Sequence, residues 1–296
     1  LDDAINSDIV YLIPCQFTLI NSDLNEKLVK IGEDSNETFI TGESATQYPK
    51  AHVFRFANSD FSLRIIDTPG IGDVRGIDKD KENFQNLLTF ISNYKSIDAI
   101  CILLNQNNTR LGVAFRFYLK ELLSNLHKSS KDNIVFCFTN SRGTFYRPGD
   151  TMPVLRKLLK EINDQSGIEV PLSNNNIFCY DNESFRFLAA LKNEIQFSDN
   201  ERADFSGSWN SSVEMTQKMM AYILNLPSHD VKETTTLNDS RKMILELSRP
   251  IADISQNIQQ NIKLINNKMN ELSILDVNST ELKGKLHIPA VDLAIK

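Results

Sequence analysis

The segment 67–70, Asp-Thr-Pro-Gly, combines residue types that can hold a divalent cation and a phosphate group. It follows the largely apolar run 63–66, which predicts a strand that ends at the carboxylate of Asp67. Ligands of open α/β sheets lie at the carboxyl ends of the strands, where Asp67 could bind Mg²⁺ directly or through water. Gly70 would let the backbone approach a phosphate closely. The alternative is an ordinary strand-end turn, since Asp, Pro and Gly all favour turns.

Thr46 is the second residue with this potential. It lies in a loop 21 residues before Asp67, a span that fits one intervening hairpin formed by strands at 50–56 and 63–67. A threonine in such a loop can place its hydroxyl on Mg²⁺ and its N–H on a γ-phosphate, which makes the loop sensitive to the bound nucleotide. The alternative is a solvated loop threonine.

The elements around these residues alternate between strand and helix. Residues rich in Val, Ile, Phe and Thr predict a β-hairpin at 8–20 and 28–40. Near-continuous apolar runs predict buried strands at 97–104, 133–139 and 176–180. Helical spacing of apolar residues predicts helices at 82–94, 114–126, 154–162 and 183–193. This alternation predicts an α/β fold with a mostly parallel sheet and helices on both faces.

The sequence changes character after residue 197. We expect a linker at 198–235, irregular over 199–212 and with a short amphipathic helix at 213–226, and then a helical, coiled-coil-like extension at 236–296. Its apolar residues recur at steps of three or four from 244 to 272, which favours a self-association or partner helix over one packed on its own domain. Pro250 should kink or break this helix.

Composition narrows the class of protein. The chain has 32 basic and 38 acidic residues, a net charge of −6, which argues against a nucleic-acid-binding surface. Its longest apolar runs fall short of the ~20 residues that span a bilayer, and we predict a cytoplasmic protein. The four cysteines are widely spaced: Cys15, Cys101, Cys137 and Cys179. The last three lie in apolar runs, so we expect small buried side chains rather than metal ligands or disulfides.

Together, these motifs resemble the septin and immunity-associated (GIMAP-like) branch of the P-loop GTPases. The resemblance rests on Asp-Thr-Pro-Gly-Ile-Gly-Asp at 67–73, Ser-Ala-Thr at 44–46, Phe-Thr-Asn-Ser at 138–141 and the helical C-terminal extension. Stretches at 42–49 and 226–232 are similar to a group of G-domain-containing proteins within that branch. The resemblance covers about residues 1–250.

The resemblance implies a protein that binds GTP or GDP with Mg²⁺, hydrolyses GTP slowly and associates through its G domain or its flanking helices. Thr46 and Asp67 would hold the metal and Gly70 would meet the γ-phosphate. Ile71 stands where small GTPases often have a Gln that orients the attacking water, so intrinsic hydrolysis should be slow. The polar stretch after it, from Asp73 to Lys81, suggests a mobile second switch or a solvated loop. No residue is assigned a catalytic role.

The phosphate loop of this family is not found in residues 1–296. None of the eleven glycines begins Gly-x-x-x-x-Gly-Lys-Ser/Thr. We therefore expect 1–197 to be an incomplete G domain without its first strand and phosphate loop, with exposed strand edges, low solubility and poor GTP binding. Finding that motif in frame shortly before Leu1 in the gene would favour a fragment of a GTPase.

The base-binding region departs from the family pattern as well. After the strand at 133–139, relatives carry Asn-Lys-x-Asp or Thr-Lys-x-Asp, whose aspartate reads guanine. Here Thr139 is followed by Asn140 at the lysine position and Arg142 at the aspartate position. An arginine has no acceptor, so it would stack on the base or reach guanine O6 instead. Tyr180 lies where a second base-contacting loop is expected.

Two main hypotheses follow for the function. The first is a GTP-binding switch protein, a slow GTPase of which this chain is a fragment that is inactive by itself. The alternative is a pseudo-GTPase, an interaction or scaffold protein that keeps the fold and acts through its C-terminal helix. A third, weaker interpretation is an unrelated α/β domain with a coiled-coil tail. Partners would be GTP or GDP and a second copy, joined through the G domain or residues 244–272.

Overall fold

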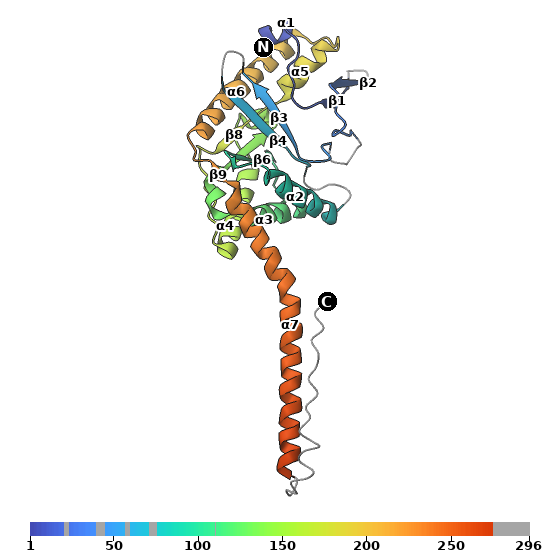
Figure 1. The fold of residues 1–296 in the computed structure, drawn as a ribbon. Coiled ribbons are helices and arrows are strands. Elements are labelled where there is room, and N and C mark those ends of the chain that lie inside the picture. Colours follow the sequence, from blue (N-terminus) through green and yellow to red (C-terminus); the bar gives the residue numbers. More distant parts are fainter. Residues whose placement is uncertain (21–23, 40–44, 57–59, 71–75, 110, 275–296) are drawn as a thin grey trace. The chain divides into compact units, whose positions relative to one another are not determined.

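A computed structural model describes residues 1–296 except 21–23, 40–44, 57–59, 71–75, 110 and 275–296 (Figure 1). The chain divides into two compact units, Leu1–Leu237 and Asn238–Lys296. Three predicted parts lie partly outside the described residues: the second switch at 73–75, the resembling stretch at 42–44 and the extension at 275–296. The rest of the predicted switch, 78–81, lies in the helix Ile77–Ile91.

Two antiparallel hairpins form the first part of the larger unit. After the short helix α1 (Asp2–Asn6), β1 (Cys15–Ile20) pairs with β2 (Glu26–Ile31), and β3 (Lys50–Arg55) pairs with β4 (Ser62–Asp67). Both hairpins were predicted from the sequence, although the first is shorter than expected. The register of the second places Lys50 opposite Asp67 and so brings the loop before β3 to the end of β4.

A three-stranded parallel sheet occupies the middle of this unit. Its order is β6 (Ile100–Asn105), β7 (Ile134–Thr139) and β8 (Ile177–Cys179). The connecting helices are α2 (Ile77–Ile91), α3 (Val113–Asn125), α4 (Thr151–Ser166), α5 (Glu183–Lys192) and α6 (Asp199–Leu224). The remaining short elements are β5 (Ser96–Ile97), paired with β9 (His229–Asp230), and the 3₁₀ turns η1 (Lys128–Asn133) and η2 (Ser141–Thr144).

Helices cover both faces of this parallel sheet. On one face Phe136 and Phe138 of β7 pack with Leu119 of α3 and with Leu155 and Leu158 of α4. On the other face a second set packs against α6, formed by Val135, Cys137, Phe178, Met215, Met219 and Tyr222. β7 is buried along almost its whole length because both of its faces are covered. The predicted mixed α/β class with a parallel sheet is confirmed.

β6 lies at an edge of the parallel sheet within the described residues, where it pairs with β7 alone. Its side chains at 102 and 104 enter the core, and those at 101 and 103 face the opposite way. Leu103 is 67% exposed, and Cys101 is exposed as well. The burial expected of Cys101 is wrong, whereas that of Cys137 and Cys179 is confirmed.

α6 corrects the prediction of an irregular segment at 199–212. Ser198 accepts a hydrogen bond from the backbone N–H of Glu201, whose carboxylate accepts from the N–H of Ser198 in return. This capping box satisfies two donors at the start of the helix. It lets the helix begin at Asp199 despite the many Ser, Asn and Gly residues that follow.

The last helix, α7, runs without interruption from Val231 to Ile274. Pro250 lies inside it, so the predicted break at this proline is wrong. A proline removes one backbone hydrogen bond, and here the favourable helix formers on both sides, such as Leu247 and Ala252, continue the helix past it. Among the helices that the structure describes, none is both long enough and apolar enough to cross a bilayer.

Candidate functional site

Thr46 and Asp67 meet at the end of the β3–β4 hairpin. The Thr46 hydroxyl donates a hydrogen bond to Asp67 Oδ2 over 2.8 Å, and Thr46 is 8% exposed. The hairpin register explains the contact, because it returns the chain from Asp67 to Lys50, only four residues after Thr46. The structure therefore brings together the two residues that were predicted to hold a metal.

Glu37 is a third member of this cluster that the sequence analysis missed. An isolated antiparallel bridge joins Glu37 to Thr46, with backbone hydrogen bonds from Thr38 N to Ala45 O and from Gln47 N to Asn36 O. Glu37 Oε2 consequently lies 3.2 Å from the Thr46 hydroxyl oxygen. A hydroxyl has one proton, and the shorter distance assigns that proton to Asp67.

The cluster is rich in negative charge. Burial, and then the charge of Asp67, raise the pKa of the Glu37 carboxyl above its ordinary value. Among the described residues, the ammonium of Lys50 lies near this cluster and forms an ion pair with Asp34, and their hydrogen bond lowers the pKa of that carboxyl. The carboxylates of Asp67 and Glu37 lie close together, which favours the arrival of a cation.

The oxygen atoms at this cluster fit a hard divalent cation. Hydroxyl and carboxylate oxygens are donors that Mg²⁺ prefers, and two neighbouring oxygens around it are about 2.9 Å apart when each lies 2.0–2.1 Å from the metal. The Thr46 and Asp67 oxygens are 2.8 Å apart. Among the described residues, no group of three His, Cys, Asp or Glu side chains could hold a metal by itself. A metal at this pair would need further ligands besides Thr46 and Asp67.

Gly70 lies three residues beyond this pair. It is exposed, next to the buried Pro69, and the following residues 71–75 are outside the described part of the chain. Its predicted contact with a γ-phosphate remains a prediction, as does the effect of Ile71 on hydrolysis.

The predicted base region gathers at the ends of β7 and β8. The backbone N–H and the hydroxyl of Ser141 both donate to the carbonyl oxygen of Tyr180 over 2.9 Å. Asn140 adopts a left-handed conformation, with φ of 56°, and its carbonyl accepts from the Gln106 side chain over 2.7 Å. The Thr139 hydroxyl donates to the carbonyl of Leu104. The loops that follow these two strands are thus held side by side.

Arg142 is held by the protein itself. Its Nε lies 3.3 Å from Asp181 Oδ2, and its guanidinium stacks over the Phe205 ring of α6 at 5.0 Å from the centroid. The Asp181 side chain is only 2% exposed and also accepts a hydrogen bond from the Ser208 hydroxyl over 2.6 Å. Nothing in the sequence spacing indicated this partnership, because Phe205 and Ser208 come from a segment that was predicted to be irregular.

Tyr180 is likewise turned inward. Its hydroxyl lies 3.4 Å from the sulfur of Met219 on α6, and burial raises the pKa of this phenol well above its ordinary value. The side chains of Arg142 and Tyr180 therefore both contact α6, whereas the backbone of 139–141 lines the ends of the strands.

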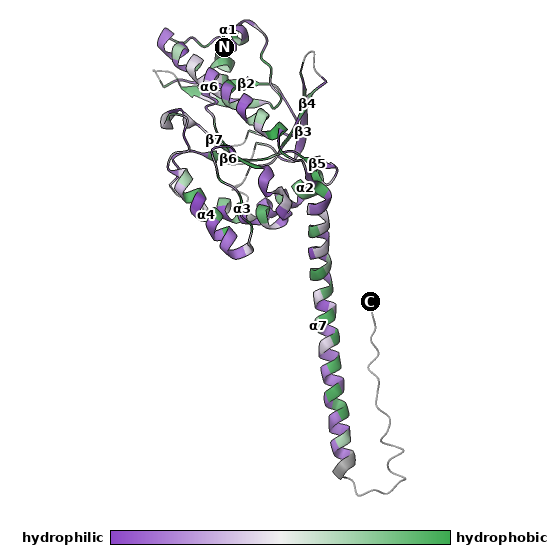
Figure 2. Ribbon diagram, turned by 90° about the vertical axis from the view of Figure 1, so that its left-hand side faces the viewer, coloured by the Kyte–Doolittle hydropathy of each residue, from purple (hydrophilic) through white to green (hydrophobic). Residues whose placement is uncertain are grey.

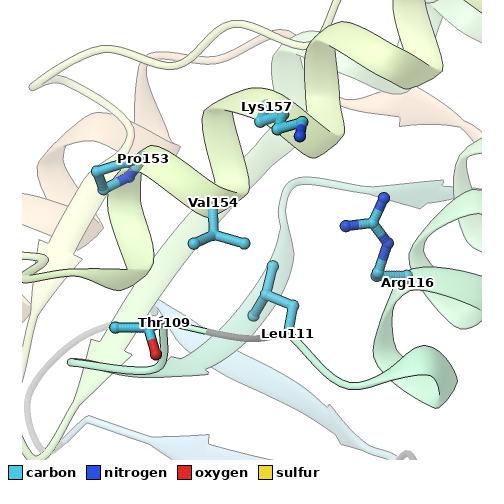
Figure 3. A pocket seen from close by; sticks show the side chains of 6 residues that line it. All are labelled: Thr109, Leu111, Arg116, Pro153, Val154 and Lys157. Atoms are coloured by element: carbon cyan, nitrogen blue, oxygen red, sulfur yellow. The ribbon is translucent and has the colours of Figure 1, made fainter.

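A shallow pocket of about 480 Å³ lies elsewhere, between α3, the start of α4 and the loop after β6 (Figure 3). Its lining contains none of the predicted site residues: Thr109, Leu111, Arg116, Pro153, Val154 and Lys157. Arg116 is already paired with Glu161 over 2.6 Å. The chemistry favours the Thr46–Asp67 cluster as the candidate site.

No family model matches the chain, and no curated protein matches it either. The assignment of a function therefore depends on the residues and the geometry of the cluster. The strongest geometric feature is the contact between Thr46 and Asp67, which two separate motifs predicted.

Proposed function

We propose that this protein is a GTP-binding switch protein in which Thr46 and Asp67 hold a nucleotide-bound Mg²⁺. The observation that carries the proposal is the 2.8 Å hydrogen bond between the two side chains. It joins a loop threonine to the acid at the end of a strand, as a nucleotide switch requires. The excess negative charge around Glu37 supports the same conclusion, since a cation would relieve it.

The geometry suggests how the loop before β3 would respond. When bound, Mg²⁺ neutralises phosphate charge and links the phosphates to the protein. The Thr46 hydroxyl would give up its hydrogen bond to Asp67 when its oxygen turns to the metal. The backbone bridge between Glu37 and Thr46 connects this loop to Glu37. A change at one hydroxyl would therefore be transmitted to the bridged residues 36–38 and 45–47, which a partner could sense.

Two features limit affinity and hydrolysis. Residues 1–296 contain no Gly-x-x-x-x-Gly-Lys-Ser/Thr motif, so these residues alone offer no array of backbone N–H groups of that kind for the β-phosphate. Arg142, at the position of the guanine-reading acid, is engaged by Asp181 and Phe205. We expect weak nucleotide binding by this chain and slow hydrolysis, in keeping with the isoleucine at 71.

An NMR titration of the 296-residue chain with GTP tests this function, with and without Mg²⁺. We expect shifts of the backbone amides near Thr46 and Asp67 only when both are present, at high nucleotide concentration, and their loss in Asp67→Asn. Asp60→Asn is the matched control, because Asp60 is exposed in the loop between β3 and β4. Shifts that persist in Asp67→Asn, or no shift in the wild type, would contradict the proposal.

A second candidate function has its own supporting observation. A pseudo-GTPase that acts as an interaction protein through its C-terminal helix would explain the many exposed apolar residues of α7. The same NMR titration separates the two functions. A protein that only scaffolds would show no Mg²⁺-dependent nucleotide response while it still binds through α7.

A further inference from the structure

The loop after β7 presents one aromatic ring to solvent. Phe145 is 82% exposed, the largest exposed fraction among the large apolar side chains that the structure describes. Its backbone is left-handed, with φ of 56° and ψ of 41°, and the next residue, Tyr146, has φ of 57°. Left-handed backbone is uncommon in bulky residues, costs stability and concentrates at ligand-binding and active sites. The loop therefore holds an exposed aromatic surface at a cost in stability.

Hydrogen bonds and packing fix the part of the loop that carries this ring. The N–H of Phe145 donates to the carbonyl of Arg142 over 3.0 Å, and the N–H of Tyr146 donates to the carbonyl of Ser141 over 2.9 Å. Tyr146 packs against the main core, as do the hydrophobic residues of α4, which lie between hydrophilic ones along that helix (Figure 2). Tyr146 thus anchors the loop, while Phe145 beside it stays exposed.

This turn lies at the predicted base region. Tyr146 is bonded to Ser141, and Ser141 donates two hydrogen bonds to the carbonyl of Tyr180 in the loop after β8. Phe145 is therefore next to the junction that joins the two loops. Ligands of open α/β sheets bind at the carboxyl ends of the strands, and both loops begin at such ends. The one strongly exposed ring of this turn is thus placed close to where a base would bind.

The groups that could select guanine at this place are otherwise engaged. Selecting guanine requires an acceptor for its N–H groups, and Arg142 has none and is held by Asp181 and Phe205. The Asp181 carboxylate is 2% exposed and is bonded within the protein. The one acid within 140–150 is Asp150, at the start of α4. Stacking on an aromatic ring, by contrast, tolerates every base, because every base has a π-face.

We propose that Phe145 stacks on the base of the bound nucleotide and that the protein accepts nucleoside triphosphates without selecting guanine. This inference rests on the proposed function, in which Thr46 and Asp67 hold the Mg²⁺ that is bound to the phosphates. It names a wider class of ligand, because contact through phosphates and one ring face admits ATP as well as GTP.

An NMR titration of the 296-residue chain with GTP, ATP and tripolyphosphate, each with Mg²⁺, tests this inference. We expect dissociation constants for GTP and ATP that agree within about threefold, because stacking tolerates either base. Both nucleotides should shift the backbone amides at 141–147. Tripolyphosphate has no base, so it should shift the amides near Thr46 and Asp67 and leave those at 141–147 unchanged.

Phe145→Asn removes the ring and places at this position a residue that tolerates left-handed backbone, so the fold should be kept. It should raise the dissociation constants of both nucleotides about tenfold and leave that of tripolyphosphate unchanged. Phe145→Trp keeps an aromatic ring and should retain binding. Leu24→Asn is the matched control, because Leu24 is 81% exposed and has φ of 62° in the loop between β1 and β2.

The possible failures of the two proposals are distinguishable. A preference for GTP of about tenfold or more, above all one that Asp150→Asn abolishes, would overturn the lack of selection. Equal effects of Phe145→Asn and Leu24→Asn, or nucleotide shifts confined to the surroundings of Thr46 and Asp67, would overturn the stacking and leave the proposed function standing. No response to any of the three ligands would overturn the proposed function and this inference with it.

Discussion

Asp67 ends strand β4 and Asp181 follows strand β8, yet the surroundings of their carboxylates differ. Asp181, two residues after β8, is buried, and its Oδ2 contacts the guanidinium of Arg142 and accepts a hydrogen bond from the Ser208 hydroxyl. Asp67 has the Thr46 hydroxyl, but it also faces the carboxylate of Glu37. Among the described residues, the Asp181 carboxylate has a guanidinium partner, whereas the Asp67 carboxylate lies beside a second carboxylate.

The contrast separates an acid that stabilises the fold from one that is suited to a ligand. A buried charge without a partner is costly, so the pair of Arg142 with Asp181 holds η2 to the loop after β8, and the Ser208 hydroxyl joins that loop to α6. Two neighbouring carboxylates lower stability unless a cation binds, and groups with a shifted pKa, such as Glu37 here, concentrate at functional sites. The comparison therefore supports a structural role for Asp181 and agrees with the binding role proposed for Asp67.

Removing the partner of Asp181 should give the largest effect on stability. Arg142→Ala leaves a buried carboxylate with only its hydroxyl partner, and we expect a loss of about 2 kcal/mol, at the lower end for a broken buried pair because Arg142 is half-exposed. Urea denaturation measures it. Arg147→Ala, at an exposed position in the same loop, should stay within about 0.5 kcal/mol of wild type. A loss no larger than that control would break the comparison.

His229 extends the comparison to a buried histidine. Its surroundings favour the neutral ring over the protonated one. Its ring nitrogens lie 3.1 Å from the Ser129 hydroxyl and 2.8 Å from that of Thr234, and burial lowers its pKa. His127, Asp230 and Glu233 also face it, and the carboxylates only partly oppose this shift.

A lowered pKa means that the unfolded chain takes up the proton first. The free energy of unfolding should therefore fall as pH drops below the ordinary histidine value of 6.5, through the lower pKa of the folded protein. Urea denaturation of wild type and His229→Asn at several pH values measures this dependence. The variant should show a flatter pH dependence between pH 6.5 and the acid range. An unchanged slope would show that His229 is not the group involved.

Glu37→Gln should give the smallest change in stability, and it should stabilise the protein rather than destabilise it. The folded protein raises the pKa of Glu37, so stability from this group falls as pH rises from 4.5 through the folded pKa. Removing the charge should raise the unfolding temperature slightly at pH 7, with no gain at pH 4. Glu33→Gln is the control, since the hydrogen bond with Lys30 lowers the pKa of Glu33. A higher unfolding temperature for Glu33→Gln but not for Glu37→Gln would contradict the inference that the charge of Glu37 destabilises the fold.

Local patterns predicted most of the fold. The apolar runs at 133–139 and 63–67 and the helical spacing at 154–162 indicated elements that the structure contains. The start of α6 was missed because Ser, Asn and Gly residues have weak helix propensity, although Ser198 and Glu201 carried the capping signal.

The site was predictable where a motif marks a strand end, and not where partners come from distant segments. Thr46 and Asp67 were found because the hairpin between them has a recognisable length. Glu37 was not predicted as a member of the site, because an isolated backbone bridge brings it to Thr46 and no sequence motif marks that bridge. The pairing of Arg142 with Asp181 was not predicted, because it joins two loops that are distant in sequence and is completed by Ser208 of α6.

The most direct test of the account is whether Asp67 holds a divalent cation in the presence of nucleotide. Electron paramagnetic resonance of Mn²⁺, in place of Mg²⁺, measures the free ion in mixtures with GTP and protein. We predict that wild type and Asp60→Asn lower the signal beyond the effect of GTP alone and that Asp67→Asn does not. An equal loss of signal with Asp67→Asn would contradict the role of Thr46 and Asp67 in binding the metal.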